Sequence, residues 1–588
     1  MLIWVLLTGI YYFFLLYPLI RYRAFDSIPA KRANGIITLF VYFAVGALIF
    51  AAISGEQFIY YWDYGGYYDR TIFIKNMYEG SALDVLKNVY ETSTLSDYGT
   101  WISAVMAVPL QLTQCRFVDY IMLVYLMFAL PAACSLSLLG GGYFSEKQHK
   151  YFFLGCNVLI LLMPWYLQPM LEGYPGIAAF VPLICSLWIF LKSEGLYKIT
   201  LADAVVLSFS FIAAALLRRY FCFYLVGFVF GGICYSFCCW RMHRQGKAEL
   251  FQYAASYMKV GCISMFTLIL FFPGFLQRVL FVDYAGMYVA YNNGSILEKC
   301  RAFTDHLGML LLLFILFAAI AVCRNYKNYI PLVLFCSVFE VVAAVCFFSV
   351  QSVGIHHYWT FLLPLLLLLM LFLSLIMADR RNIYFVICSI CFFYNTIYVY
   401  FGTSMPMMNA AICQRDLYVR KNRTDLTAVG ELTEYLQSIQ EDKKIYCIAS
   451  GSVLNNDILS KYYLPEACPL QLSAVSHVDL RDGFSEEFFT SDIVVTTEPV
   501  QIHLREQDQQ VITVLQREFA DEHSNISSHF EKVHTTQLAD GVTVHVYLKK
   551  SGFSVEDISY LEGIYDSLYP DHLELFHDRF EEVKTKCF

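Results

Sequence analysis

Residues 358–378 read "YWTFLLPLLLLLMLFLSLIMA", twenty-one positions without one charged side chain. As an α-helix rising about 1.5 Å per residue, this stretch would cross a hydrocarbon core of about 30 Å. The whole chain shares its character, since 58% of the 588 residues are hydrophobic, 17% are aromatic and only 15% are charged. This composition predicts a polytopic α-helical membrane protein.

Eleven further apolar stretches of about 17–25 residues are long enough to be spans, so we expect about twelve transmembrane helices in a domain covering residues 1–401. The expected spans are 2–20, 34–54, 116–139, 151–170, 176–192, 199–217, 219–239, 256–275, 306–323, 329–350, 358–378 and 382–401.

The short connectors between these stretches carry basic residues on every second loop, as at Arg21 and Arg23, or Arg241 and Arg244. The positive-inside rule assigns such loops to the cytoplasm. We therefore expect a multi-pass protein of the cell membrane in which the loop 55–100 and the chain after about 402 are extracytoplasmic. The net charge of -8 argues against a nucleic-acid partner.

The tail, residues 402–588, differs in composition and predicts an extracytoplasmic soluble α/β domain. Strands rich in β-branched residues are expected at 443–450, 491–497 and 542–550, and helices at 426–441 and 555–584. The stretch "GSVLNND" at 451–457 is either a ligand-binding loop or a plain connector between strand and helix, because it lacks the spacing of a phosphate-binding glycine motif.

The extracytoplasmic loop begins with "FIYYWDYGGYYDR", residues 58–70, directly after the second expected span. A carboxylate this close to hydrocarbon is costly without a function, so we interpret Asp63 as a general base that takes the proton of an acceptor hydroxyl. Gly65 and Gly66 are expected to let the backbone turn sharply beside it. The surrounding tyrosines and Trp62 either anchor the interface or stack on sugars.

Other polar residues are expected on the same side of the membrane. Arg218 and Arg219 lie at an outer helix end, where guanidinium groups suit phosphate oxygens, although snorkelling to headgroups is the alternative. His356 and His357 are candidates for hydrogen bonds to the same phosphate. A further acid, Glu340, lies inside an expected span and should hydrogen-bond a neighbouring helix.

Together, Asp63 in "WDYGGYYD", about twelve spans, the arginine pair and the extracytoplasmic tail resemble the GT-C superfamily of integral-membrane glycosyltransferases, which includes protein O-mannosyltransferases and aminoarabinose transferases. The resemblance implies that Asp63 is the catalytic carboxylate and that the donor is a sugar on a polyprenyl phosphate or diphosphate. It leaves Asp69, Glu172 and Tyr67 as acceptor-binding residues or a second acid. A divalent metal is compatible with the family, but Asp63 is followed by Tyr64 rather than by a second acid, so no paired-acid ligand is visible there.

The sequence therefore predicts an inverting glycosyltransferase that moves a sugar from a polyprenyl-phosphate donor to a glycan, lipid or protein acceptor of the cell envelope. Three alternatives stay open: a transporter or flippase of lipid-linked saccharides, a polymerase of such saccharides, and a non-catalytic envelope scaffold. A transporter would place its charges at mid-bilayer, whereas the charges here cluster at the expected outer helix ends.

Overall fold

The computed structural model describes residues 1–27, 31–144, 151–244, 246–378, 382–401, 412–415, 418–521 and 523–587. The chain divides into two compact units, each assembled from three segments. The helical unit comprises Met1–Gly55, Arg70–Val282 and Gly294–Arg420, and the sheet unit comprises Glu56–Asp69, Asp283–Asn293 and Lys421–Phe588. The predicted domain boundary at 402 lies outside the described residues.

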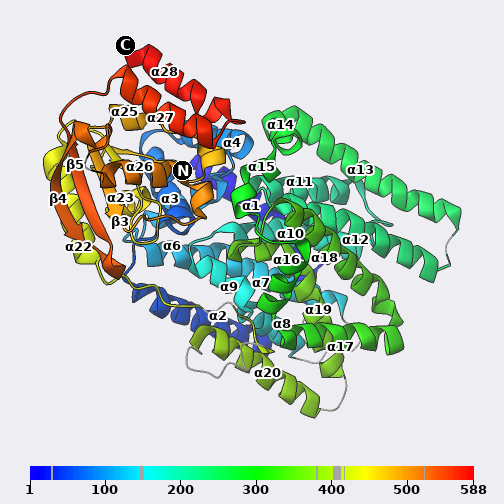
Figure 1. Cartoon of the computed structure of the whole chain (residues 1–588). Helices are drawn as coiled ribbons and strands as arrows, with labels where there is room; N and C mark the ends of the chain where they lie inside the picture. Colours follow the sequence, from blue (N-terminus) through cyan, green and yellow to red (C-terminus); the bar gives the residue numbers. More distant parts are fainter. Residues whose placement is uncertain are drawn as a thin grey trace. The chain divides into compact units, whose positions relative to one another are not determined.

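The helical unit is built almost entirely of helices (Figure 1). Its α-helices are α1 (Leu2–Arg21), α2 (Lys31–Ser54), α4 (Ala82–Leu95), α5 (Trp101–Leu110), α6 (Phe117–Val124), α7 (Leu130–Tyr143), α8 (Phe152–Leu161), α9 (Pro164–Leu171), α10 (Phe180–Lys192), α11 (Leu201–Leu217), α12 (Phe221–Met242), α13 (Lys247–Phe271), α14 (Pro273–Phe281), α16 (Ile296–Leu307), α17 (Met309–Asn325), α18 (Ile330–Val350), α19 (Trp359–Ala378) and α20 (Asn382–Phe401). Helix α3 (Trp62–Gly80) begins in the sheet unit and ends in the helical unit.

Of the twelve-span prediction, the structure confirms only the coarser part, a helical protein with several candidate membrane-spanning helices. Among the described residues, seven helices are long and apolar enough to cross a membrane, or nine if two bent pairs each count as one span. The pair α8–α9 bends by 43° at Pro164, and the pair α16–α17 bends by 92° at Gly308, whose φ of 83° favours glycine. Three of the expected spans fall on shorter apolar helices at 176–192, 201–217 and 386–400.

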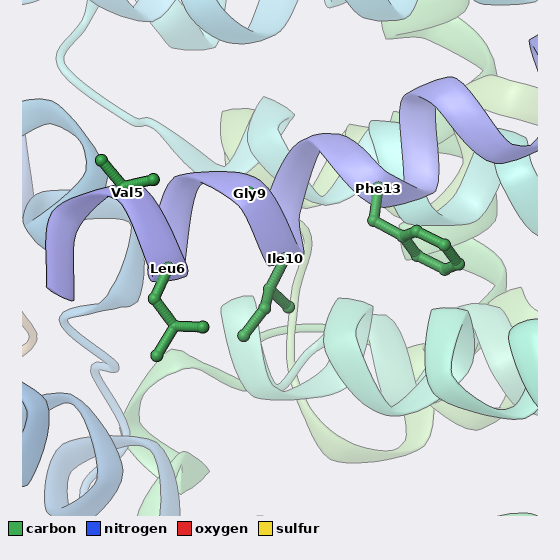
Figure 2. Close-up of a pocket in the computed structure, with 5 residues that line it drawn as sticks. All are labelled: Val5, Leu6, Gly9, Ile10 and Phe13. Carbon is green, nitrogen blue, oxygen red and sulfur yellow. The ribbon is translucent and has the colours of Figure 1, made fainter. Parts of the chain in front are cut away.

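The outer surface of α1 is apolar. A depression of about 410 Å³ lies beside this helix. Its lining residues are Val5, Leu6, Gly9, Ile10 and Phe13 (Figure 2). All the lining residues come from one helix, and the four large side chains are exposed. A surface of this kind is expected where a helix faces lipid chains.

The sheet unit contains a five-stranded sheet in the order β2-β1-β3-β5-β4 (Figure 1). The first three strands, β1 (Ile445–Cys447), β2 (Leu472–Ser473) and β3 (Ile493–Glu498), are parallel, and β5 (Thr543–Lys549) and β4 (Phe530–Gln537) continue the sheet antiparallel. The unit also contains the helices α15 (Tyr284–Met287), α22 (Leu426–Gln440), α23 (Asn456–Lys461), α24 (Asp479–Asp482), α25 (Glu487–Thr490), α26 (Gln510–Ala520), α27 (Val555–Leu568) and α28 (His577–Cys587).

Alternating strand residues supply two hydrophobic cores, one on each face of the sheet. Ile445 and Val495 pack with side chains of α22 and α23, whereas Tyr446 and Val494 pack with side chains of α26, α27 and α28. The sheet unit is therefore a three-layer α/β/α arrangement. The three predicted strands and both predicted helical regions are present, although the region 555–584 is two helices rather than one.

Candidate functional site

Asp63 lies in the first turn of α3, and this turn belongs to the sheet unit. Its side chain is half-buried. Among the residues that the structure describes, no hydrogen bond or ion pair engages its carboxylate. A carboxylate that the fold does not use in this way has both oxygens available to a ligand, which is what a general base requires.

The backbone around Asp63 is held by the tail of the chain. The backbone N–H of Trp62 donates to Asp457 Oδ2 at 2.7 Å, and Lys461 Nζ donates both to the Trp62 carbonyl at 3.2 Å and to Asp457 Oδ2 at 2.6 Å. Ile59 and Tyr61 are buried in the core formed with α22 and α23. The position of Asp63 therefore depends on residues almost 400 positions later in the sequence.

Gly65 is required for space rather than for the sharp turn that the sequence suggested. A Cβ atom at Gly65 would lie 1.8 Å from the carbonyl oxygen of Tyr60, far inside any allowed contact. At Gly66 the nearest such atom is Lys461 Nζ at 3.9 Å, an ordinary contact. The left-handed backbone conformation belongs instead to Trp62, with φ of 48°.

The aromatic residues of this segment serve different purposes. Tyr61 and Tyr67 are buried, and Tyr67 is only 3% exposed, so its ring packs inside the protein. The ring centroid of Tyr64 lies 3.9 Å from Lys421 Nζ, close enough for a cation–π contact. The second acid, Asp69, is exposed, and its spacing of six residues places it on a different side of α3 from Asp63.

The helical unit brings together three of the residues expected to bind phosphate. Arg218, at the C-terminal end of α11, is only 8% exposed. Its guanidinium carbon lies 5.1 Å from the ring centroid of Tyr220. That ring lies 5.3 Å from His357 and 5.8 Å from His356, and the two imidazoles are 3.9 Å apart. The structure thus brings Arg218, His356 and His357 together, and their binding of phosphate stays a prediction.

Three aromatic or basic residues complete this cluster, and sequence reasoning did not find them. Tyr174 stacks on His356 with centroids 4.3 Å apart. The ring of Tyr98 lies 4.4 Å from the guanidinium carbon of Arg70 and 5.9 Å from that of Arg218. Glu172 lies two residues before Tyr174, at the end of α9, and is half-buried. We call Arg70, Tyr98, Tyr174, Arg218, Tyr220, His356 and His357 the arginine–histidine cluster.

Arg219 is engaged elsewhere. Its guanidinium pairs with the carboxylate of Asp97 and donates to the Ser96 carbonyl, and Arg278 joins the same carboxylate at 3.0 Å. This three-residue ion pair network connects the segment after α4 to the turn between α11 and α12 and to α14. Within the described residues, then, the two adjacent arginines differ: Arg219 belongs to an ion pair network, whereas Arg218 belongs to the arginine–histidine cluster.

One group of described residues has metal-ligand geometry. Glu562, Asp566 and His577 have ligand atoms within 4.8 Å of one another, but Lys584 Nζ already lies 2.5 Å from Glu562 Oε2, and His577 Nδ1 lies 3.0 Å from Asp566 Oδ2. The lysine and histidine thus engage one oxygen of each carboxylate, whereas Glu562 Oε1 and Asp566 Oδ1 form no hydrogen bond with a described residue. This group includes none of the residues predicted for the site, so it offers no support for a metal beside Asp63.

The chain has no match among protein-family models and none among curated proteins. The resemblance to membrane glycosyltransferases thus rests on the sequence of this chain alone.

Proposed function

We propose that this protein is an inverting membrane glycosyltransferase that uses a sugar on a polyprenyl phosphate. The observation that carries the proposal is Asp63, a half-buried carboxylate at the start of α3 with no hydrogen bond or ion pair to any described residue. It follows the apolar helix α2 by only nine residues. The phosphate of a lipid-linked donor lies at the surface of the bilayer, and a base that follows the end of a spanning helix is expected at the same depth.

In the proposed reaction, the acceptor hydroxyl oxygen attacks C1 of the donor sugar and its proton passes to an oxygen of Asp63. The bond between C1 and the phosphate oxygen breaks, and the polyprenyl phosphate leaves with the electron pair. General-base assistance of this kind contributes about 10²–10⁴-fold to the rate. We expect Arg218, a buried residue of the helical unit, to bind the phosphate oxygens of the donor, as guanidinium groups commonly do.

The role of Arg218 is tested by comparing it with its neighbour. We expect Arg218→Gln to raise the donor concentration needed for half-maximal rate by about tenfold or more, because a charge-assisted hydrogen bond contributes about 1.5–3 kcal/mol. The acceptor dependence should change little. Arg219→Gln, the matched control, should lower thermal stability through its partner Asp97 and leave the donor dependence near normal. Initial rates over a range of donor and acceptor concentrations would measure both. An equal effect of the two variants on donor dependence would contradict this assignment.

The proposal also requires Asp63 and the tail to be extracytoplasmic, as the basic connectors indicate. Alkaline phosphatase, which is active only outside the cytoplasm, should be active when fused after Phe588. The same enzyme fused after Arg244, in an expected cytoplasmic connector, should be inactive. The opposite pattern would place Asp63 on the wrong side for a donor presented at the outer leaflet.

One observation favours a second function, a proton-coupled transporter of lipid-linked saccharides. Both carboxylate oxygens of Glu340, in the middle of α18, are buried without a hydrogen-bond partner among the described residues, contrary to the expected bond with a neighbouring helix. Acids within spanning helices often carry protons in transporters. Glu340→Gln should leave sugar transfer intact if the protein is a transferase, and should abolish saccharide movement across proteoliposomes if it is a transporter.

A further inference from the structure

The strand order of the sheet reverses at β1, which lies between β2 and β3. The chain runs from β1 to β2 on one side, and then returns to β3 on the other side of β1. In open α/β sheets, ligands bind outside the carboxyl ends of the strands at such a reversal. Here the loops that follow β1 and β3 are joined by a bond from the Ser450 N–H to the Gln501 carbonyl at 2.8 Å.

A network of polar side chains occupies this edge. Ser450 Oγ lies 2.8 Å from His477 Nδ1 and 3.0 Å from His503 Nδ1, so one hydroxyl connects the loops after all three parallel strands. Gln509 fixes the arrangement through two hydrogen bonds of 2.9 Å. Its Oε1 accepts from the backbone N–H of His503, and its Nε2 donates to the backbone carbonyl of His477. Ser450 and Gln509 are fully buried, whereas the two histidines remain partly exposed.

Two aromatic side chains reach the same edge from distant parts of the sequence. The ring of Trp62 lies 4.5 Å from that of His503, and Tyr291 Oη lies 3.4 Å from His503 Nε2. Both aromatic residues are half-buried. The edge therefore combines aromatic rings with hydrogen-bonding groups, and one of these rings, Trp62, directly precedes Asp63.

The charges at this edge are balanced within the protein. Arg481 binds the two oxygens of Asp482 at 2.6 and 2.9 Å, and Lys461 binds Asp457 at 2.6 Å. Burial is the largest cause that lowers the pKa of both histidines, and burial together with the neighbouring His477 lowers the pKa of His503 to about 4. At neutral pH the imidazoles are thus uncharged, and a ligand here meets hydrogen-bonding groups rather than excess cationic charge.

Asp63 lies within electrostatic reach of this edge. Burial first, and then Arg481, Asp482 and Asp63, perturb the pKa of Tyr291, which is raised overall. The carboxylate assigned as the general base thus acts on the same tyrosine that contacts His503.

We infer that the carboxyl edge of β1 and β3, with Trp62, Tyr291, Ser450, His477 and His503, binds an uncharged saccharide. Aromatic rings stack on the apolar faces of sugars, and neutral imidazole and hydroxyl groups match sugar hydroxyls as donors and acceptors. Charge compensation by Asp482 and Asp457 disfavours a phosphate or carboxylate ligand. The inference deepens the proposed function, on which it rests for the role of this saccharide: the acceptor whose hydroxyl Asp63 deprotonates.

Saturation-transfer NMR on the full-length protein in detergent tests this inference, with methyl glycosides of neutral hexoses and N-acetylhexosamines as probes. At least one glycoside should receive saturation. Trp62→Leu and His503→Gln should each weaken its binding by roughly two- to tenfold, the range expected for loss of one aromatic contact or hydrogen bond. Tyr435→Leu removes a ring that stacks on His534 elsewhere in the same unit and is the matched control. Thermal melting of each variant would identify loss of fold.

The outcomes separate this inference from the proposed function. Asp63→Asn should keep glycoside binding while transfer is lost. Glycoside binding without any transfer activity of the native protein would overturn the proposed function and leave the saccharide site standing. Methyl phosphate serves as a charged comparison probe. Absence of glycoside binding, binding by Trp62→Leu and His503→Gln as tight as that by Tyr435→Leu, or preferential saturation of methyl phosphate would overturn the saccharide site, whatever the transfer activity.

Discussion

Replacing Asp63 by Asn is expected to lower the rate of sugar transfer by about 100-fold or more. Asparagine keeps the size of the side chain but cannot accept the acceptor's proton. Because no described residue forms a hydrogen bond or ion pair with the carboxylate, the substitution removes no internal contact of that kind, and the variant should insert and fold normally. The donor concentration needed for half-maximal rate should change much less than the maximal rate.

The measurement is release of polyprenyl phosphate by purified protein supplied with a polyprenyl-phosphate sugar and an acceptor. Asp69→Asn is the matched control, since Asp69 is exposed on another side of the same helix and should lose little activity. Near-normal transfer by Asp63→Asn would remove the central claim of the proposed mechanism. An equal loss in both variants would point to the charge of the segment rather than to one base.

The second large effect is expected at Gly65, where alanine should strongly destabilise the start of α3. Its Cβ would meet the Tyr60 carbonyl oxygen at 1.8 Å, and because the obstacle is backbone it cannot move aside as a flexible side chain would. Overpacking of this kind costs about 1–3 kcal/mol or more. Tyr60 is followed at once by Tyr61, which is buried in the sheet unit, so the displacement should disturb that core as well.

Gly66→Ala is the control at the neighbouring position, and we expect near-native behaviour because its Cβ meets only Lys461 Nζ at 3.9 Å. The melting temperatures of the two purified variants, together with the yield of folded protein from each, would compare their stabilities. If the Gly65→Ala protein were as stable as the Gly66→Ala protein, the start of α3 would accommodate the extra Cβ atom and this prediction would be wrong.

Parts of the fold could be predicted because local sequence carries the signal. The strands β1 and β3 are almost entirely buried, β5 alternates buried Val544 and Val546 with partly exposed residues, and all three were predicted. Strand β4, "FEKVHTTQ", was missed because it is an edge strand with mostly exposed polar side chains. Helix α3 was interpreted as part of a loop, since its glycines and tyrosines are poor helix formers and long-range packing decides its conformation.

The positions of the candidate site residues were also predictable only in part. Arg218, His356 and His357 could be grouped because each lies beside an expected outer helix end, and the structure brings them together. The pairing of Arg219 with Asp97 could not be foreseen, because the two residues are 122 positions apart and neither belongs to a recognisable motif. Membership of residues 56–69 in the sheet unit depends equally on long-range contacts.

The assembly of the sheet unit from three separated segments has a consequence for biosynthesis. Ile59 and Tyr61 leave the ribosome early, yet the core that covers them includes Val544 and Val546, near the other end of the chain. Translation adds about 5–20 residues per second, so these core partners are synthesised on the order of half a minute or more after Ile59 and Tyr61. A chaperone could hold them during that interval, and any premature stop codon before β5 would leave the segment containing Asp63 with an incomplete core, exposed to quality-control proteases.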